Sequence, residues 1–553
     1  MKVLHYISIL FLLLCLAACK DSRIEDLTEQ RVLGDSLYVQ LTLDLLNSSN
    51  DTRAVPNGGE EGDGWKSGHS YENQLHNFTV FVLNYSASIN SLANTPFAGK
   101  RYFSDDEVAE IDSIYQENLR LKNYDVYKNV TTYEFTIPII QEKAATMPDA
   151  DTYRFIVVAN QGDLTQTYQT LGDLRDGKPD KTWTDTSVGP GRFVMSNEND
   201  LFHSSGIGTS DNPIRLHVTI ERMAARIDFD PKGSEISGNA LCYPLNNNDS
   251  EHTLLANLYV DRMSIVNGCI KPSYYIKRVA DFDGTNLTNL TYLGDETPTP
   301  SGISTNYVID PYFLQKTDAN RTDETLLNTL FGNSRINNAN VLLASNASQV
   351  SSIIPLEAPL ETVTLGYVNE NTYARDMAVK EYTTGVVLQC RFEPKHNYYT
   401  SYSYDVETKA ETFTEGTYTG GTFYMVEPNK KDISEADRLY FSNEDAAKAY
   451  ATNTAKEHFC KVVKYANGIC YYYIYMRHSN NVEVIHDTME FGIVRNNIYR
   501  FSINAATGPG SPKLYDPNDT DSDGTYNPRD PEELKARIYV KKWVSIEHPI
   551  IYV

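Results

Sequence analysis

Four carboxylates near the C-terminus have the spacing of a cation-binding loop. Asp519, Asp521 and Asp523 alternate along the chain, and Gly524 follows them. Oxygen ligands at alternate positions ahead of a turning glycine can surround a hard cation such as calcium. The twelfth position of such a loop is Asp530, where a bidentate glutamate is usual, and no flanking helices are predicted. We therefore favour a solvated acidic loop and no metal site, with calcium as the alternative.

The motifs of common enzyme classes do not occur in this sequence. It contains no G-x-S-x-G elbow, H-E-x-x-H helix, Walker A loop or dinucleotide-binding glycine pattern. The 11 histidines have no metal-type spacing. With 73 acidic residues, no glycosidase pair can be selected. We expect a protein without a cofactor that is not an enzyme.

Cysteine chemistry is concentrated at the N-terminus. Of seven cysteines, Cys15 and Cys19 belong to the leader, which leaves an odd number without C-x-x-C spacing. A zinc site or redox pair is therefore poorly supported. Export would permit a disulfide between Cys460 and Cys470 across a hairpin, but buried free thiols are favoured.

The first 18 residues have the pattern of a signal peptide. A short basic start precedes an apolar stretch over 6–16, which is too short to span a membrane. The sequence Leu16-Ala17-Ala18-Cys19 then resembles the lipobox of bacterial lipoproteins. That resemblance implies diacylglycerol on the Cys19 thiol and cleavage just before it; an ordinary signal peptide is the alternative. No later segment is apolar for long enough to cross a bilayer.

Composition limits the possible partners and folds. The 553 residues are enough for two to four domains. A net charge of −24 repels phosphate backbones, which excludes most nucleic-acid binding. The 39 tyrosines, against 3 tryptophans, favour strands and turns over helices.

One strand stands apart from the others. Strict alternation of apolar and polar residues predicts a half-buried strand whose apolar positions are Leu37, Val39, Leu41, Leu43 and Leu45. A polar stretch at 47–53 follows at once, and a Gly-rich one at 56–64 comes next. A good strand ahead of a long loop containing an arginine is unusual for a plain domain, and it makes sense if the strand is meant to be removed.

Short strands with turn-rich connections continue to the C-terminus, with helices predicted at 104–121 and 443–459. The predicted fold is all-β, with two antiparallel β-sandwich domains of transthyretin-like, Greek-key type and short helical insertions. After the leader (1–18), we expect a propeptide carrying the removable strand (19–53), an N-terminal sandwich (54–235) and a C-terminal sandwich (236–553).

Several short motifs resemble the fimbrillin family of Bacteroidales. They include Tyr471 to His478, Met489 to Arg500, Gly508-Pro509-Gly510, Trp543-Val544, Arg222 to Asp228 and Val157 to Asn160. The similarity is greatest to the major shaft subunit of the short (minor) fimbriae. It covers most of the exported chain and is most specific over 468–553.

This resemblance implies a polymerising subunit of a type V pilus. In that scheme a lipidated precursor reaches the outer membrane, and a trypsin-like, Arg-specific protease removes the lipid and the first strand, leaving a cell-surface fimbrium. The matching bond is Arg53-Ala54; cleavage at Arg31 or Arg23 would leave the strand in place. The implied partners are copies of the chain itself, tip and anchor subunits, and host or bacterial surface ligands that support adhesion.

Physical reasoning explains how such a cut could drive assembly. Five apolar side chains at about 1.5–3 kcal/mol each would lose about 7–15 kcal/mol of burial. A strand from a neighbouring copy could fill the opened groove, giving an open-ended, head-to-tail filament. The apolar positions of the expected donor segment are Ile538, Val540, Val544, Ile546, Ile550, Ile551 and Val553.

Three alternatives stay open. Residues 536–553 can instead be the last strand of their own sandwich. The chain can be a tip or anchor subunit, of which an anchor would keep its lipid. It can also be a glycan-binding outer-membrane lipoprotein, although such proteins resembling the starch-utilisation binders are helix-rich and rely on tryptophan platforms.

Overall fold

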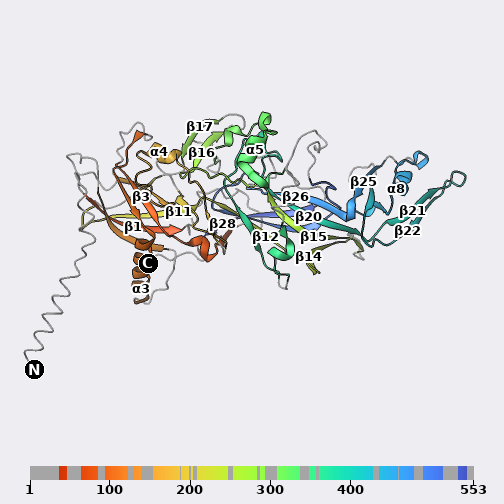
Figure 1. The fold of residues 1–553 in the computed structure, drawn as a ribbon, viewed down its shortest axis with the longest axis horizontal. Helices are drawn as coiled ribbons and strands as arrows, with labels where there is room; N and C mark the ends of the chain where they lie inside the picture. The colour runs from red at the N-terminus through yellow and green to blue at the C-terminus, as the bar shows by residue number, and fades with distance from the viewer. Residues whose placement is uncertain are drawn as a thin grey trace, which may run out of the picture. The chain divides into compact units, whose positions relative to one another are not determined.

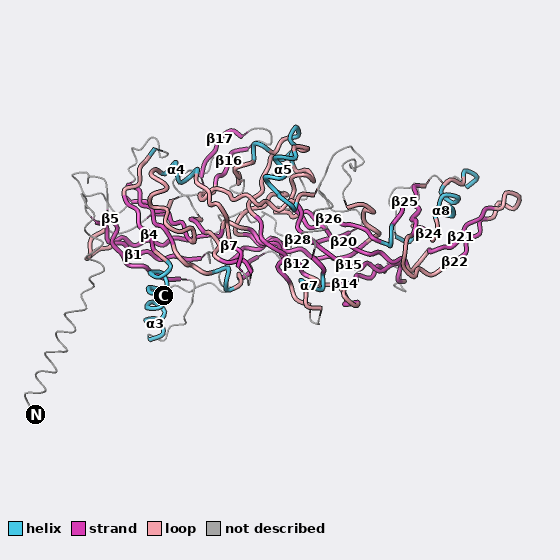
Figure 2. Tube along the Cα trace, viewed as in Figure 1, coloured by secondary structure: helices cyan, strands magenta, loops and turns pink. Residues whose placement is uncertain are grey.

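Strands dominate the chain, and the helices are few and short (Figure 2). The computed structural model describes residues 36–45, 64–84, 94–121, 130–138, 153–186, 189–198, 201–203, 208–246, 253–282, 287–292, 308–336, 348–356, 360–427, 435–456, 458, 460–478, 490–514 and 534–544. Within this part of the chain, no helix is long and apolar enough to cross a membrane.

The chain divides into two compact units, each made of segments that are distant in sequence. Unit 1 consists of residues 1–44, 75–175 and 201–219, and unit 2 consists of residues 45–74, 176–200 and 220–553. The sequence-based division at residues 53 and 235 stays a prediction about domains. The two units differ from it mainly because residues 64–74 pack with the C-terminal part of the chain.

Unit 1 is built around antiparallel strands. In it, β3 pairs with β4 and β6, β10 pairs with β6, and β1 lies between β11 and β5. β6 is buried along its whole length, whereas β11 alternates buried and exposed residues, as a strand with one solvated face must. The elements are β1 (Ser36–Leu45), β3 (Phe78–Asn84), β4 (Gly99–Phe103), α3 (Asp105–Leu121), β5 (Val130–Pro138), β6 (Tyr153–Ala159), α4 (Leu171–Asp176, which ends in unit 2), β10 (Phe202–His203) and β11 (Ile214–Arg222, whose last residues belong to unit 2).

Unit 2 contains two sheets packed face to face. One core cluster takes side chains from both sheets, including Phe229 and Phe501 from the first and Leu258 and Leu388 from the second. The first sheet has the order β19 (Val363–Val368), β12 (Ala225–Asp230), β27 (Asn497–Ala506), β28 (Leu534–Val544), β2 (Gly64–Ser67). The second has the order β13 (Glu235–Ser237), β14 (Ala240–Asn246), β15 (Leu254–Val266), β20 (Gly385–Pro394), β26 (Ile469–Tyr475), with β18 (Ser348–Gln349) also on β15.

A third sheet of unit 2 is inserted between β20 and β26, and its hairpin β21–β22 extends away from the β14–β15–β20 region (Figure 1). Its order is β22 (Glu411–Glu415), β21 (Tyr398–Tyr404), β24 (Leu439–Phe441), β23 (Phe423–Glu427), β25 (Lys461–Tyr465). The remaining strands of unit 2 are β7 (Thr184–Thr186), β8 (Gly189–Gly191), β9 (Met195–Asn197), β16 (Arg278–Phe282) and β17 (Leu287–Tyr292). Its helices are η1 (Ser70–Asn73), η4 (Phe313–Gln315), η5 (Asp318–Asn320), α5 (Glu324–Phe331), η6 (Gly332–Ser334), α7 (Val350–Ile353), η8 (Arg375–Met377), η9 (Glu435–Asp437), α8 (Glu444–Ala451), η10 (Thr454–Lys456) and η11 (Ala466–Gly468).

The all-β prediction is confirmed, with two differences of detail. Among the described strand pairs whose register is known, three are parallel: β12 with β27, β2 with β28, and β21 with β24. The helix predicted at 104–121 is α3, but the one predicted at 443–459 ends at Ala451. Asn443 caps its first turn, and Thr452 and Asn453, which are poor helix formers, follow its last residue.

The five cysteines in the described part of the chain are free thiols, and the Cys460–Cys470 disulfide does not form. Cys470 lies directly opposite Cys390 instead. Met476 N–H donates to the Thr384 carbonyl at 2.9 Å in the same register, so Cys390 and Cys470 fall on a hydrogen-bonded pair. The Cβ atoms of such pairs are about 5.5 Å apart, against about 3.8 Å in a disulfide. The two thiols therefore stay unlinked.

A buried histidine makes the stability of unit 2 dependent on pH. Burial lowers the pKa of His478 to about 4, and its Nδ1 lies 2.8 Å from the Tyr499 hydroxyl. The unfolded chain binds a proton near pH 6.5 and the folded chain only near pH 4. Stability should therefore be complete above pH 6.5 and fall by about 3 kcal/mol as the pH drops to 4.

Urea unfolding followed by tryptophan fluorescence measures this effect, because Trp65, Trp183 and Trp543 all belong to unit 2. His478→Asn should flatten the pH dependence, and replacement of the exposed His217 by Asn should leave it unchanged. Equal slopes in wild type and His478→Asn would contradict the assignment.

Candidate functional site

The strand predicted to be removable is a fully paired strand of unit 1. β1 runs antiparallel to β5 in continuous register, from Ser36 opposite Pro138 to Asp44 opposite Val130. β11 is its neighbour on the other edge. At the start of β1, Tyr38 N–H also donates to the Gly208 carbonyl at 3.0 Å. Both edges of β1 are therefore bonded within the chain.

The apolar side chains of β1 face the core, as its alternation predicts. Leu41 is completely buried, and Leu37 is the most exposed of the four described leucine and valine side chains, at 7 %. Leu45 closes the strand, but its side chain lies outside the described residues. On the opposite face Tyr38 is 44 % exposed. Four such burials correspond to about 6–12 kcal/mol.

The outer face of β1 is joined to β5 by polar side chains. The Gln40 amide donates to Glu134 Oε1 at 2.8 Å, and the hydroxyls of Thr42 and Thr132 are 3.0 Å apart. Both pairs are directly opposite in the register. Exposed cross-strand pairs of this kind contribute only about 0.2–1 kcal/mol each. The burial of the inner face is the larger part of what holds β1.

β5 has a second attachment to unit 1 that does not involve β1. Tyr133 packs edge-on against Phe78 of β3 with ring centroids 4.8 Å apart, and Phe135 packs against Phe103 of β4 at 4.9 Å. The Arg101 guanidinium lies over Phe103 at 4.6 Å. These contacts hold β5 by its face. Loss of β1 would therefore leave a groove between β11 and β5.

Gly208 shapes the mouth of this groove. Its φ of +78° is a conformation that L residues rarely adopt, and a Cβ there would lie 2.6 Å from Leu37 Cδ2. Glycine thus lets the loop before β11 approach the first apolar side chain of β1.

The predicted donor segment begins inside unit 2. Ile538 and Val540 lie in β28, which pairs antiparallel with β27 and parallel with β2. Val544 is the last residue of β28, and Ile546, Ile550, Ile551 and Val553 lie outside the described residues. Over 534–544, the arrangement is therefore that of a strand within its own sheet.

Other predicted sites fall outside the described part of the chain. These are the lipidation site Cys19, the cleavage site at Arg53 and Ala54, and the acidic loop Asp519, Asp521, Asp523 and Asp530. They stay predictions.

Sequence reasoning missed a buried cluster of charges in unit 2. Glu72 of η1 is fully buried, and its Oε2 accepts bonds from Arg226 Nη1 at 2.8 Å and Trp543 Nε1 at 3.1 Å. Tyr367 donates its hydroxyl to Oε1. Arg226 also binds Asp228 at 3.0 Å. A fully buried carboxylate held by three side chains links the segment 64–73 to β12, β19 and β28.

A second arginine completes the cluster. Arg222 donates to the backbone carbonyls of Glu72 at 2.9 Å and Trp543 at 3.0 Å, and to the Asn73 side chain. Its guanidinium lies over the Trp543 ring at 4.7 Å. Burial lowers the pKa of Arg222 to about 10. Charged residues at 222, 226 and 228, alternating within an apolar strand pattern, are the signal that could have revealed this cluster.

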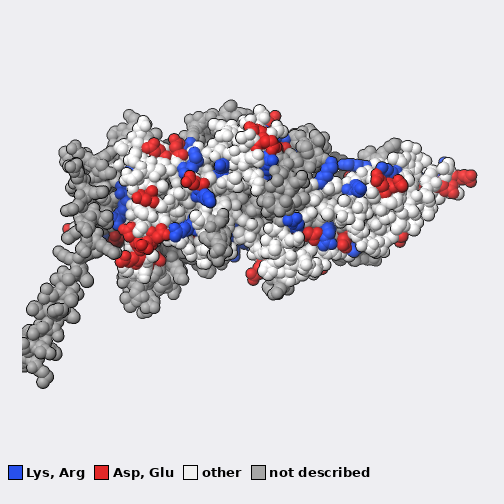
Figure 3. Space-filling view, in the orientation of Figure 1, with Lys and Arg blue, Asp and Glu red and all other residues white. Residues whose placement is uncertain are grey.

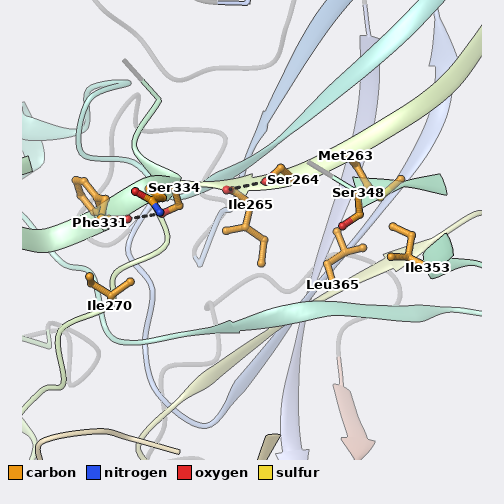
Figure 4. A pocket seen from close by; sticks show the side chains of 11 residues that line it. Met263, Ser264, Ile265, Ile270, Phe331, Ser334, Ser348, Ile353 and Leu365 are labelled. Atoms are coloured by element: carbon orange, nitrogen blue, oxygen red, sulfur yellow. Dashed lines mark hydrogen bonds between the residues drawn. The ribbon is translucent and has the colours of Figure 1, made fainter. Parts of the chain in front are cut away.

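An apolar recess in unit 2 offers no catalytic groups (Figure 4). Its volume is about 460 Å³, and its apolar lining residues include Ile265, Leu365, Ile353 and Ile270. None of its lining residues is titratable. Across the described residues, no group of three or more His, Cys, Asp or Glu side chains is placed to hold a metal. On the face that Figure 3 shows, basic side chains are scattered among acidic ones.

The C-terminal part of the chain matches a known family. Residues 463–548 match the model of the major fimbrial subunit protein type IV, fimbrillin, C-terminal. This confirms the predicted resemblance to fimbrillins and supports a fimbrial subunit. No curated protein matches the chain.

Two solved fimbrial proteins of Porphyromonas gingivalis are similar to the chain at low identity. The fimbrillin FimA has a TM-score of 0.35 and 13 % identity, over 93 % of this chain and 99 % of that one. The tip fimbrial protein Mfa3, with a C-terminal truncation, has a TM-score of 0.32 and 9 % identity, over 92 % and 100 %.

Truncating the inner face of β1 should destabilise unit 1 selectively. We expect Leu41→Ala to cost about 2–5 kcal/mol, because it leaves a cavity beside Tyr133. Thr42→Ala, on the outer face of the same strand, should cost under about 1 kcal/mol. Unit 1 has no tryptophan. The loss should therefore appear in hydrogen exchange of β5 and β11 while the tryptophan transition of unit 2 is unchanged. Equal effects of the two variants would show that β1 is not held by its inner face.

Proposed function

We propose that this chain is the shaft subunit of a cell-surface fimbria and that it polymerises by protease-triggered strand exchange. The observation that carries the proposal is β1, a buried strand that is bonded on both edges and is followed in the sequence by Arg53. The lipidated precursor would reach the outer membrane through Cys19, and cleavage at Arg53-Ala54 would separate β1 and the lipid from the rest of the subunit.

The groove left by β1 supplies the driving force for assembly. It would expose the apolar positions that Leu37, Val39, Leu41 and Leu43 cover, together with unpaired backbone groups on β11 and β5. A strand from a neighbouring copy restores both the burial and the hydrogen bonds. Because donor and groove are different surfaces, the contact repeats head to tail and does not close.

The donor in this proposal is the tail that follows β28. Ile538 and Val540 already pair with β27, and their release would expose the buried Trp543. Residues 545–553 number nine and can span about 30 Å when extended. That length matches the ten-residue β1. Ile546, Ile550, Ile551 and Val553 supply apolar side chains, and Pro549, which lacks an N–H, costs one backbone bond.

The finished fimbria would support adhesion through ligands on host or bacterial surfaces, with tip and anchor subunits as its other partners. The match to a major fimbrial subunit model favours the shaft over these two roles.

Limited digestion of the protein with an Arg-specific protease tests the proposal. The wild type should acquire Ala54 as its N-terminus and form a denaturant-resistant ladder. Arg53→Ala should stay monomeric because β1 is retained, and Arg31→Ala should behave as wild type. A chain lacking residues 545–553 should be cleaved and stay folded, yet fail to polymerise.

Monomers that persist after complete cleavage at Arg53 would refute strand exchange. Unfolding of the chain without 545–553 would identify the tail as part of its own fold instead.

A further inference from the structure

The segment immediately after the proposed cleavage site is fastened to the end of β28. β2 pairs with β28 from Gly64 opposite Lys541 to Ser67 opposite Val544, so Lys66 lies opposite Trp543. Three residues beyond β2, η1 begins, and it carries Glu72 into the buried cluster. Residues 64–73 therefore have both a strand partner and a buried ionic contact within unit 2.

The two arginines of the cluster each join η1 to other parts of unit 2. Arg222 binds the backbone carbonyls of both Glu72 and Trp543, and its Nη1 also donates to Asn496 Oδ1 at 3.1 Å. Arg226 binds the carboxylates of Glu72 and Asp228. The cluster thus holds two charged pairs whose partners are all buried. Removing one partner would leave an uncompensated buried charge, which is strongly unfavourable.

Trp543 is the point where β28 meets the segment 64–73. Its ring nitrogen donates to Glu72 Oε2, its carbonyl accepts from Arg222, and its ring packs against Tyr367 with centroids 5.8 Å apart. The next residue, Val544, ends β28 and precedes the tail proposed as the donor. A contact that fixes Trp543 therefore fixes the point from which the tail leaves.

We propose that the Glu72 cluster is an anchor that holds residues 64–73 against β28, the strand that precedes the donor tail, and keeps them closed to proteases. Lys66 is the first basic residue after Arg53, and its pairing in β2 protects the bond that follows it. A protease can cut only a locally opened chain. The rate of cleavage at Lys66 therefore reports how often residues 64–73 detach from β28. Glu72, Arg222 and Trp543 act as positioning residues for assembly.

This inference rests on the proposed cut at Arg53, but trypsin separates the two ideas because it cuts after both lysine and arginine. In the wild type, cleavage should stop with Ala54 as the N-terminus. In Glu72→Ala, the fragment beginning at Ser67 should form faster, by on the order of 100-fold, because an opened cluster leaves Arg226 without one of its two carboxylates.

Two milder variants guard against simple unfolding. Glu72→Gln keeps the shape of the side chain and removes its charge. Trp543→Phe keeps an aromatic six-membered ring and removes the N–H donor together with the five-membered ring of the indole. Both should give intermediate rates of Lys66 cleavage while the circular dichroism of the sheets is retained. Glu444→Gln removes a carboxylate from an exposed ion pair with Lys448 on α8 and should match the wild type.

The outcomes are distinguishable. Wild-type cleavage at Lys66 as fast as at Arg53, or wild-type rates in Glu72→Ala, would overturn the anchor. Protection of Lys66 together with failure to polymerise after the Arg53 cut would leave the anchor standing and refute strand exchange. If both hold, filaments of Glu72→Gln should dissociate at lower denaturant concentration than those of Glu444→Gln.

Discussion

A β-strand needs hydrogen-bonding partners along its edges and cover for its apolar face, and β1 meets both needs inside its own chain. β11 and β5 occupy its edges, and its inner face lies in the core of unit 1. A strand held in this way stays bound only while the chain connects it to the rest of its unit. The aromatic rings of β5 also pack against Phe78 and Phe103. The groove that β1 occupies can therefore persist after β1 is removed. The proposed strand exchange depends on this second attachment of β5, which does not involve β1.

The buried charges of unit 2 solve a different problem. A short segment such as 64–73 has too little apolar surface to stay bound by burial alone, and β2 offers only four residues of pairing. The Glu72 carboxylate accepts bonds from Arg226, Tyr367 and the Trp543 indole. This contact is strong because each charged partner would be costly to leave alone in the core. The same construction occurs elsewhere in unit 2, where Glu370 and Arg495 are paired at 2.8 Å with both side chains fully buried. Such buried ion pairs determine which segments come together. Apolar packing alone is less specific.

The residues of the fimbrillin-like motifs make hydrogen bonds and packing contacts within the fold of this chain. Gly508 and Gly510 accept bonds from the hydroxyls of Tyr472 and Tyr465, and a Cβ at Gly510 would lie 2.4 Å from the Tyr471 carbonyl. The run from Arg222 to Asp228 and the terminal Trp543 meet in the Glu72 cluster. These residues are far apart in sequence, so their common role could not be seen before the strands were placed.

The sequence by itself determined the strand-rich fold, the helix of residues 105–121 and the inward face of β1, because periodicity along the chain depends only on local geometry. The sequence also shows that the motifs of several common enzyme classes do not occur in this chain. Only the tertiary structure decided that residues 64–73 belong with the C-terminal unit and that Cys470 faces Cys390. It also placed Ile538 and Val540 in a sheet of their own chain. These pairings join residues that are 37 positions apart for Phe501 and Ile538 and 477 apart for Gly64 and Lys541. The alternation that makes a strand does not specify its partner. Partner choice is set by buried contacts such as Glu72 with Arg226, which exist only once the chain is folded.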